Sequence, residues 1–139
     1  MITILIHTDT RYPVNRKVVK KAVSDTFKKN KAVGLDAEVS VAVVGSRKMR
    51  ILTSEYLKDD KDHEILTFGY EEITQHKISY SGASQGYVNP PDEILKLGDI
   101  VLCWPYLLKE ASRDDMMVDD KLYNLVCHGV EHLLGITHE

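Results

Sequence analysis

Short apolar runs that suit β-strands alternate with amphipathic helical segments along this chain of 139 residues. The strand patterns cover residues 2–7, 38–44, 65–68 and 98–103, and in the second of them the valines stand at every other position. Strands this short bury little apolar surface by themselves, so helices must cover the sheet. The pattern therefore predicts an α+β fold, a small mixed four-stranded sheet packed with helices.

The predicted helices lie between and after these strands. In the first of them, residues 14–29, apolar side chains recur every three or four positions, which places them on one face. The others are a helix N-capped by Ser46 that reaches Tyr56, a short one from Pro105 to Ala111, and a last one that opens at Asp114 and Asp115 and closes at Gly135. Residues 69–97 contain Gly, Ser and Pro clusters that predict loops, with one strand at residues 77–80.

Composition narrows the class of protein. Hydrophobic residues make up 43% and charged residues 28%, as in a globular chain, so residues 1–139 are expected to form a single domain. The longest apolar stretch, residues 100–108, is interrupted by Pro105 and is too short to span a bilayer. Two cysteines cannot build a disulfide scaffold, and the first residues lack the basic start of a signal peptide. We therefore expect a cytoplasmic protein without a membrane partner.

Charge is distributed unevenly along the chain. Residues 1–50 carry 11 Lys and Arg against 4 Asp and Glu, whereas residues 51–139 carry 7 against 17. The first predicted helix holds much of this positive charge, on Lys17, Lys20, Lys21, Lys28 and Lys29. Such a helix can present a basic face to an anionic partner, and it is equally compatible with a merely solvated face.

The last dozen residues carry the pattern that is richest in chemistry. His128 and His132 are four residues apart, so on a helix both imidazoles project from one face and can reach one ion. Gly135 can end the helix with a positive φ and bring His138 back as a third ligand. Three histidines with an open fourth position are typical of catalytic zinc. We therefore expect one Zn²⁺ per chain, held by His128, His132 and His138 on the C-terminal helix and the turn after it.

Two classes of zinc peptidase share parts of this spacing. In the metzincins the general base would fall at Gly129, which has no side chain. In peptidases with the H-x-x-E-H pattern Glu131 would be the base, but these enzymes take their third ligand from a distant segment. Glu131 is also compatible with a helix residue that faces solvent. The spacing alone leaves these alternatives open.

The H-G-x-x-H-L-L-G-x-x-H motif of residues 128–138 resembles the signature of the YbeY family of bacterial rRNA-maturation endoribonucleases. Three further segments are similar to family strands in the same order, namely V-S-V-A-V-V at residues 39–44, I-L-T-F at 65–68 and L-G-D-I-V at 97–101. The resemblance covers most of residues 37–139. It implies a zinc-dependent endoribonuclease that cuts single-stranded RNA, acts in 16S rRNA 3′-end maturation and ribosome quality control, and meets its rRNA in the ribosome or pre-ribosome. It also implies a ribosomal protein or a GTPase as partner.

The chain departs from the family pattern next to the second helix. At the position of the family's active-site Arg stands Leu57, and the adjacent Lys58 supplies a charge without the bidentate fork that binds phosphate. We take Lys58 and Glu131 as candidate catalytic residues. The candidate RNA-binding residues are Lys17, Lys20, Lys21 and Lys61.

Two other functions remain open on these residues. A small zinc metallopeptidase of the H-x-x-E-H type would use Glu131 as its base. A non-catalytic zinc protein associated with the ribosome would account for the missing arginine. The basic first half of the chain favours the nuclease over the peptidase.

Overall fold

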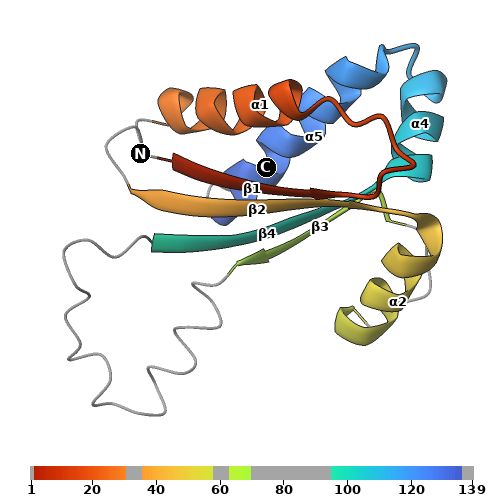
Figure 1. Cartoon of the computed structure of the whole chain (residues 1–139), viewed down its shortest axis with the longest axis horizontal. Coiled ribbons are helices and arrows are strands. Elements are labelled where there is room, and N and C mark those ends of the chain that lie inside the picture. The colour runs from red at the N-terminus through yellow and green to blue at the C-terminus, as the bar shows by residue number, and fades with distance from the viewer. Residues whose placement is uncertain (1, 31–35, 58–62, 70–94, 136–139) are drawn as a thin grey trace.

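The computed structural model describes residues 2–30, 36–57, 63–69 and 95–135. Strands and helices alternate over these residues, as the apolar pattern predicts (Figure 1). The predicted strand at residues 77–80 lies outside the described residues. In chain order the elements are β1 (Ile2–Thr8), α1 (Arg16–Lys29), β2 (Ala37–Val44), α2 (Ser46–Tyr56), β3 (Ile65–Gly69), β4 (Leu95–Cys103), α4 (Trp104–Arg113) and α5 (Val118–Leu133).

The strands form one mixed sheet in the order β1-β2-β4-β3, which confirms the α+β prediction. Strands β1, β2 and β4 run parallel, and β3 is antiparallel to β4. A parallel pair needs a crossover, and α1 supplies it between β1 and β2. Strand β4 begins at Leu95, three residues before the predicted start, and continues through Gly98. A Cβ on Gly98 would stand 2.2 Å from the Phe68 carbonyl oxygen, so only glycine allows β3 this close.

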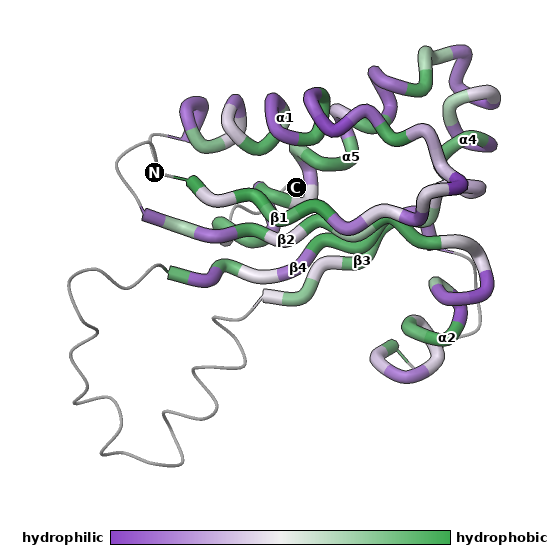
Figure 2. Tube along the Cα trace, viewed as in Figure 1, coloured by the Kyte–Doolittle hydropathy of each residue, from purple (hydrophilic) through white to green (hydrophobic). Residues whose placement is uncertain are grey.

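Helices cover the two faces of the sheet unequally (Figure 1). On one face α1 and α5 pack side by side over a large apolar core, and along α1 hydrophobic and hydrophilic residues alternate with each turn (Figure 2). On the other face α2 covers a small cluster. Fully buried members of the large core include Phe27, Val41, Ile100, Leu122 and Val126. The small cluster consists of Val44, Met49, Leu66, Val101 and Cys103.

Two predicted helix starts are displaced by one or two residues. Helix α1 begins at Arg16, because the Asn15 side chain caps it by accepting from the Lys17 and Val18 backbone N–H groups. Helix α2 begins at Ser46 itself, so Gly45 and not Ser46 is the N-cap. A residue with no side chain cannot be recognised as a cap from its hydrogen-bonding capacity, which explains this error.

The predicted start of the last helix at Asp114 and Asp115 is wrong. Helix α4 begins at Trp104, one residue before Pro105, and continues past Ala111 to Arg113, with Asp114 as its C-cap. Asp115 follows in a turn with a φ of 55°. The Asp114 carboxylate accepts from Arg113 and Lys121 instead of capping a new helix, and α5 begins at Val118. Within the described residues, no helix combines the length and the apolarity needed to cross a membrane.

Candidate metal centre

Helix α5 fixes the two candidate ligands that the structure describes. Its apolar residues face the sheet, and Leu122, Leu125, Val126, Val130 and Leu133 are buried there. Asp119 and Asp120 occupy its first turn, where negative charge is favourable. The helix ends at Leu133, and Gly135 follows with a φ of 80°, as predicted. A Cβ on Gly135 would meet no described residue within 4 Å, and the positive φ of its backbone favours glycine there.

The side chains of His128 and His132 converge on one point. Both residues are exposed, and their Nε2 atoms are 3.0 Å apart. The ring planes are nearly perpendicular, at 84°, with centroids 4.5 Å apart. Two imidazole nitrogens bound to one tetrahedral Zn²⁺ at about 2.0–2.1 Å would be about 3.3 Å apart. The two rings therefore lie within a few tenths of an ångström of the spacing that a shared ion requires.

The third candidate ligand, His138, lies outside the described residues. Among the residues that are described, no group of three metal-ligating side chains comes together. The chemistry of the available donors still suits zinc, because neutral imidazoles are among its preferred ligands. The pair His128 and His132 fits one half of a tetrahedral site, and the three-histidine site stays a prediction.

Gly129 stands between the histidines on the buried side of α5. A Cβ at this position would approach three Ile100 side-chain carbons at 3.0–3.2 Å. These distances are tighter than ordinary packing, so a side chain here would require Ile100 to move within the core. The general base of a metzincin would occupy this position. The close packing of α5 on β4 therefore disfavours the larger side chain of such a base.

Glu131 lies in a groove between α1 and α5. The groove has a volume of about 380 Å³ and is half-open, with His128 on its lining. Glu131 is half-buried there, so it does more than face solvent. Tyr123 Oη closes one side by donating to Asp25 Oδ2 over 2.6 Å, which holds the pKa of Asp25 below its usual range. The structure therefore places a carboxylate beside one of the candidate metal ligands.

The candidate RNA-binding lysines of α1 lie on the same side of the sheet as the histidines, because α1 packs against α5. Lys17 and Lys20 are exposed. Lys21 is also exposed, but its Nζ donates to Asp25 over 3.0 Å, which offsets part of its charge. Lys61 lies outside the described residues.

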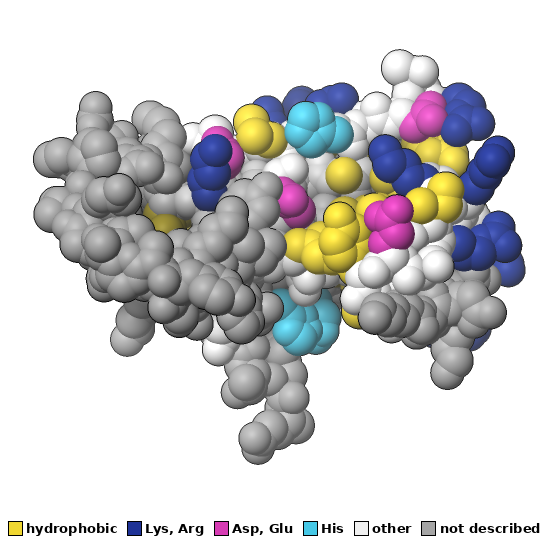
Figure 3. All heavy atoms as spheres, turned by 90° about the horizontal axis from the view of Figure 1, so that it is seen from below, with side chains coloured by type: hydrophobic (Ala, Val, Ile, Leu, Met, Phe, Trp, Pro, Cys, Tyr) yellow, Lys and Arg dark blue, Asp and Glu magenta, His cyan; other side chains and the backbone are white. Residues whose placement is uncertain are grey.

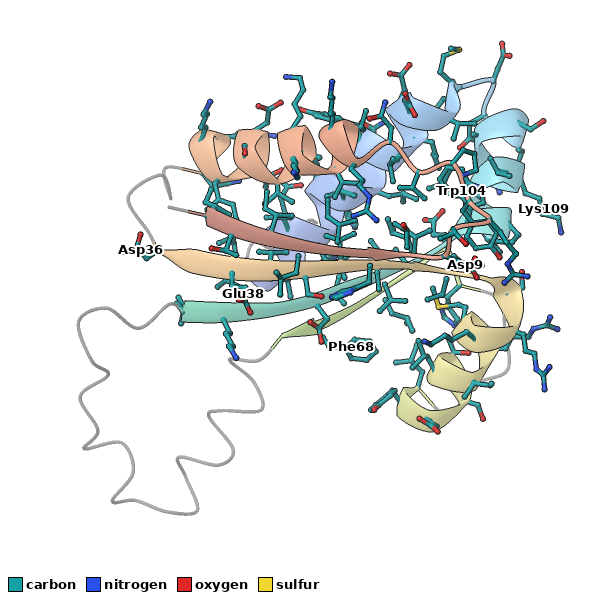
Figure 4. All side chains as sticks on the ribbon, in the orientation of Figure 1. Asp9, Asp36, Glu38, Phe68, Trp104 and Lys109 are labelled. Atoms are coloured by element: carbon teal, nitrogen blue, oxygen red, sulfur yellow. The ribbon has the colours of Figure 1, made fainter. Side chains whose placement is uncertain are left out.

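Lys58, the other catalytic candidate, also lies outside the described residues. Its neighbour Leu57 ends α2 and is 48% exposed. Helix α2 packs on the face opposite to α5, where Tyr56 contacts Phe68 of β3 with ring centroids 5.1 Å apart (Figure 4). The position at which the family has its arginine thus follows a helix that packs on the other face of the sheet from α5.

A charge cluster that the sequence did not reveal joins β3, α4 and α5. Glu110 is buried and accepts from Arg113 over 2.5 Å, with Lys121 Nζ 3.6 Å away. Glu64, just before β3, adds a carboxyl whose Oε2 is buried and has no hydrogen-bond partner among the described residues. Burial and the Glu110 carboxylate raise the pKa of Glu64 to about 7. Because Glu64 is far in sequence from Glu110, Arg113 and Lys121, no spacing could have identified the whole cluster. Lys121 lies about two turns before His128 on α5.

Comparison with known proteins agrees with the resemblance noted in the sequence. The family model described as Endoribonuclease YbeY matches residues 5–139. The Endoribonuclease YbeY of Dehalococcoides mccartyi (strain CBDB1) is 27% identical over 137 residues, which are 99% of this chain and 80% of that protein. That of Acinetobacter baumannii (strain AB307-0294) is 30% identical, with 99% of this chain and 81% of that protein covered.

A solved structure shares the fold. The solution structure of TM1509 from Thermotoga maritima matches with a TM-score of 0.56 and 21% sequence identity, and covers 100% of this chain and 75% of that one. The family model, which spans nearly the whole chain and includes the histidine helix, decides the assignment. This chain belongs to the endoribonuclease YbeY family.

Proposed function

We propose that this chain is a zinc-dependent endoribonuclease that cuts single-stranded RNA in the maturation of the 16S rRNA 3′ end and in ribosome quality control. Family membership supports the nuclease activity. The observation that carries the zinc dependence is the 3.0 Å convergence of the His128 and His132 Nε2 atoms. When bound, zinc polarises a phosphoryl oxygen and lowers the pKa of its water so that a hydroxide is available near neutral pH.

The chain's own residues bind and orient the RNA in this proposal. His128, His132 and His138 hold the ion at the end of a helix that the core fixes in place. The exposed Lys17 and Lys20 of α1 attract the phosphate backbone on the same side of the sheet. Contacts of this kind discriminate little between sequences, so a cytoplasmic ribosomal context, with a ribosomal protein or a GTPase as partner, selects the cleavage position.

Glu131 is the side chain best placed to move a proton. It lines the same groove as His128, and a carboxylate there can accept a proton from a water or a ribose hydroxyl. Lys58 and Lys61 remain candidates for phosphate contacts. With the family's arginine replaced by Leu57 on the opposite face of the sheet, we assign no bidentate phosphate contact at that position.

One preparation tests the proposal in two ways. Elemental analysis of the purified protein should find about one zinc per chain. The same preparation should cut a single-stranded RNA, lose this activity after treatment with a chelator and regain it when Zn²⁺ is returned. A protein that holds zinc and leaves RNA uncut in every ribosomal context would instead support the non-catalytic alternative.

A further inference from the structure

The connections after β1 and β2 leave the sheet on opposite sides. β1 continues into α1 on one face, whereas the neighbouring β2 continues into α2 on the other face (Figure 1). The two strands are parallel, so their carboxyl ends meet at the same edge of the sheet. In open sheets with this change of direction, a crevice forms outside the carboxyl ends, and ligands bind there. This topology singles out a place that is distant from the histidines of α5.

A groove of about 690 Å³ occupies that place. Its size is in the range of small-molecule sites, which is about 300–1,000 Å³. The strand ends contribute His7 and Thr8 from β1 and Val44 from β2, and Asp9 lies just beyond β1 (Figure 4).

One wall of the groove is aliphatic. Ala42, Ile51 and Leu52 present apolar side chains to it, and Ile51 is 51% exposed although its side chain is fully apolar. Viewed from the α2 side, hydrophobic side chains of this face are bordered by Lys and Arg (Figure 3). An apolar wall of this kind favours a flat group with apolar ring faces, such as a nucleobase, over a purely ionic ligand.

The charged side chains of the groove leave it net positive. The Asp9 carboxylate is already neutralised, because it accepts from Arg11 Nε at 3.1 Å and from Arg11 Nη2 at 2.8 Å. Arg47 and Lys48 are exposed, and within the described part of the chain no acidic side chain forms an ion pair with either of them. Two cations thus remain at the rim, and an Arg guanidinium suits phosphate oxygens well.

We propose that this crevice, between the ends of β1 and β2 and the start of α2, binds a phosphorylated nucleoside. Arg47 and Lys48 contact the phosphate, and the base lies against the wall formed by Ala42, Ile51 and Leu52. The ligand is either a free nucleotide or a nucleotide unit of an RNA chain, since both present the same phosphate and base. The site stands on the opposite face of the sheet from the candidate metal centre and does not depend on it.

Amide chemical shifts of the full chain test the site directly, in the presence of a chelator so that no cleavage takes place. AMP at about 1 mM, a concentration that reveals weak affinities, should shift the backbone amides of Thr8, Gly45 and Arg47. The double variant Arg47→Glu, Lys48→Glu should weaken this binding at least about tenfold, because a charge-assisted contact becomes a repulsion. The control Lys96→Glu, Lys109→Glu changes net charge equally on exposed sites outside the groove and should keep the AMP affinity unchanged.

A single-stranded RNA decamer distinguishes the two sources of the ligand. If the decamer shifts the same three amides and competes with AMP, the natural ligand is a unit of RNA. If AMP shifts them and the decamer does not, the ligand is a free nucleotide. The proposal is overturned if AMP leaves these amides unmoved, if the double variant binds AMP as well as the unmodified chain, or if inorganic phosphate binds as tightly as AMP. Loss of nuclease activity plays no part in any of these outcomes.

Discussion

The sheet face under α1 and α5 and the face under α2 bury very different amounts of apolar surface. The first is covered by helices of 14 and 16 residues that meet in one large core. The second is covered in part by the 11 residues of α2, and Leu5, Ile51, Tyr56 and Leu57 remain exposed on that side. Metal ligands need a fixed geometry, and α5 receives it from the thicker core. The face under α2 has the smaller apolar core, and this leaves room for the crevice at the ends of β1 and β2.

Removing a candidate metal ligand should produce the largest effect. His132→Ala should lower zinc content to background and RNA cleavage by more than about 100-fold, because an imidazole of the predicted site is lost. The unfolding midpoint of the metal-free protein should hardly change, since His132 is exposed. Elemental analysis, cleavage rates and urea unfolding in chelator measure the three quantities.

His7→Ala is the matched control on the other face. His7 is also an exposed histidine, but it lies at the end of β1 beside the α2 groove. Zinc content should stay as in the unmodified chain. Equal loss of zinc in both variants would mean that the metal is not held by α5. The candidate metal centre could then not be assigned to the face under α1 and α5.

A substitution in the contact between α5 and β4 should have the next largest effect. Gly129→Ala adds a methyl group at 3.0–3.2 Å from Ile100 and should destabilise the protein by about 1–3 kcal/mol, as overpacking does. Chemical denaturation measures this free energy. Gly69→Ala is the control, because among the described residues its Cβ would meet only Leu133 at 4.0 Å. The double variant Gly129→Ala, Ile100→Val should recover part of the loss, and an unaffected single variant would show that α5 packs less tightly than described.

Reversing charge on α1 should have a moderate effect on RNA affinity. Lys17→Glu with Lys20→Glu should weaken binding of single-stranded RNA about tenfold at low salt, and lower the slope of log K against log salt by about 1.4, if each lysine neutralises one phosphate. Binding titrations at several salt concentrations measure both. Lys109→Glu on α4, which projects away from the sheet, is the control (Figure 4). Unchanged affinity would mean that α1 presents only a solvated face.

Much of this architecture could be predicted from periodicity alone. The alternation of valines in β2 and the spacing of apolar residues in α1 and α5 report burial on one face, which the core then imposes. Histidine spacing likewise placed His128 and His132 on one side of α5, since four residues make about one turn. These features depend on residues that are close together in sequence, so the folded protein keeps them.

Features that depend on distant residues could not be predicted. Asp114 looked like a helix start, but Arg113 and Lys121 hold its carboxylate at the end of α4. Glu64 meets Glu110 only because β3 and α4 come together in space. The groove at the ends of β1 and β2 depends on which face each connection takes, and the amphipathic pattern of a helix does not reveal that.

The charge cluster that contains Glu64 and Glu110 should make the free energy of unfolding depend on pH. Folding raises the pKa of Glu64 from 4.5 to about 7, so between these values the folded protein holds a proton that the unfolded chain has lost. The contribution of Glu64 therefore falls as pH rises from about 4.5 to 7. Glu64→Gln cannot ionise and should stabilise the protein by about 1 kcal/mol at pH 8, less than the full shift because Glu64 is only half-buried.

At pH 5 the same substitution should change the free energy of unfolding by much less. Glu110 acts in the opposite direction, because its neighbours lower its pKa and its contribution is lost in acid. Glu55→Gln, on the exposed side of α2, is the control and should leave the pH dependence of unfolding unaltered. If Glu64→Gln destabilises at pH 8 as much as at pH 5, the raised pKa is wrong.

The smallest effect on RNA cleavage is expected at Glu131, although it lies beside His128. In the nuclease, the predicted zinc site supplies the main catalytic contribution, and the family that the chain resembles usually has Leu at this position. Glu131→Leu should therefore leave RNA cleavage within about tenfold of the unmodified chain, a smaller loss than the roughly 100- to 10,000-fold that removal of a general base typically costs. In an H-x-x-E-H peptidase the same residue is the general base, and its removal should cost orders of magnitude.

Glu131→Gln separates the charge of this side chain from its shape. The amide fills the same half-buried space between α1 and α5, so a loss of rate in this variant reports the missing carboxylate and not a change in packing. If both substitutions spare RNA cleavage, Glu131 is not the general base of the nuclease. If Glu131→Gln abolishes a measurable peptidase activity while the unmodified protein leaves RNA uncut, the face under α1 and α5 carries a peptidase site and the proposed nuclease function is wrong.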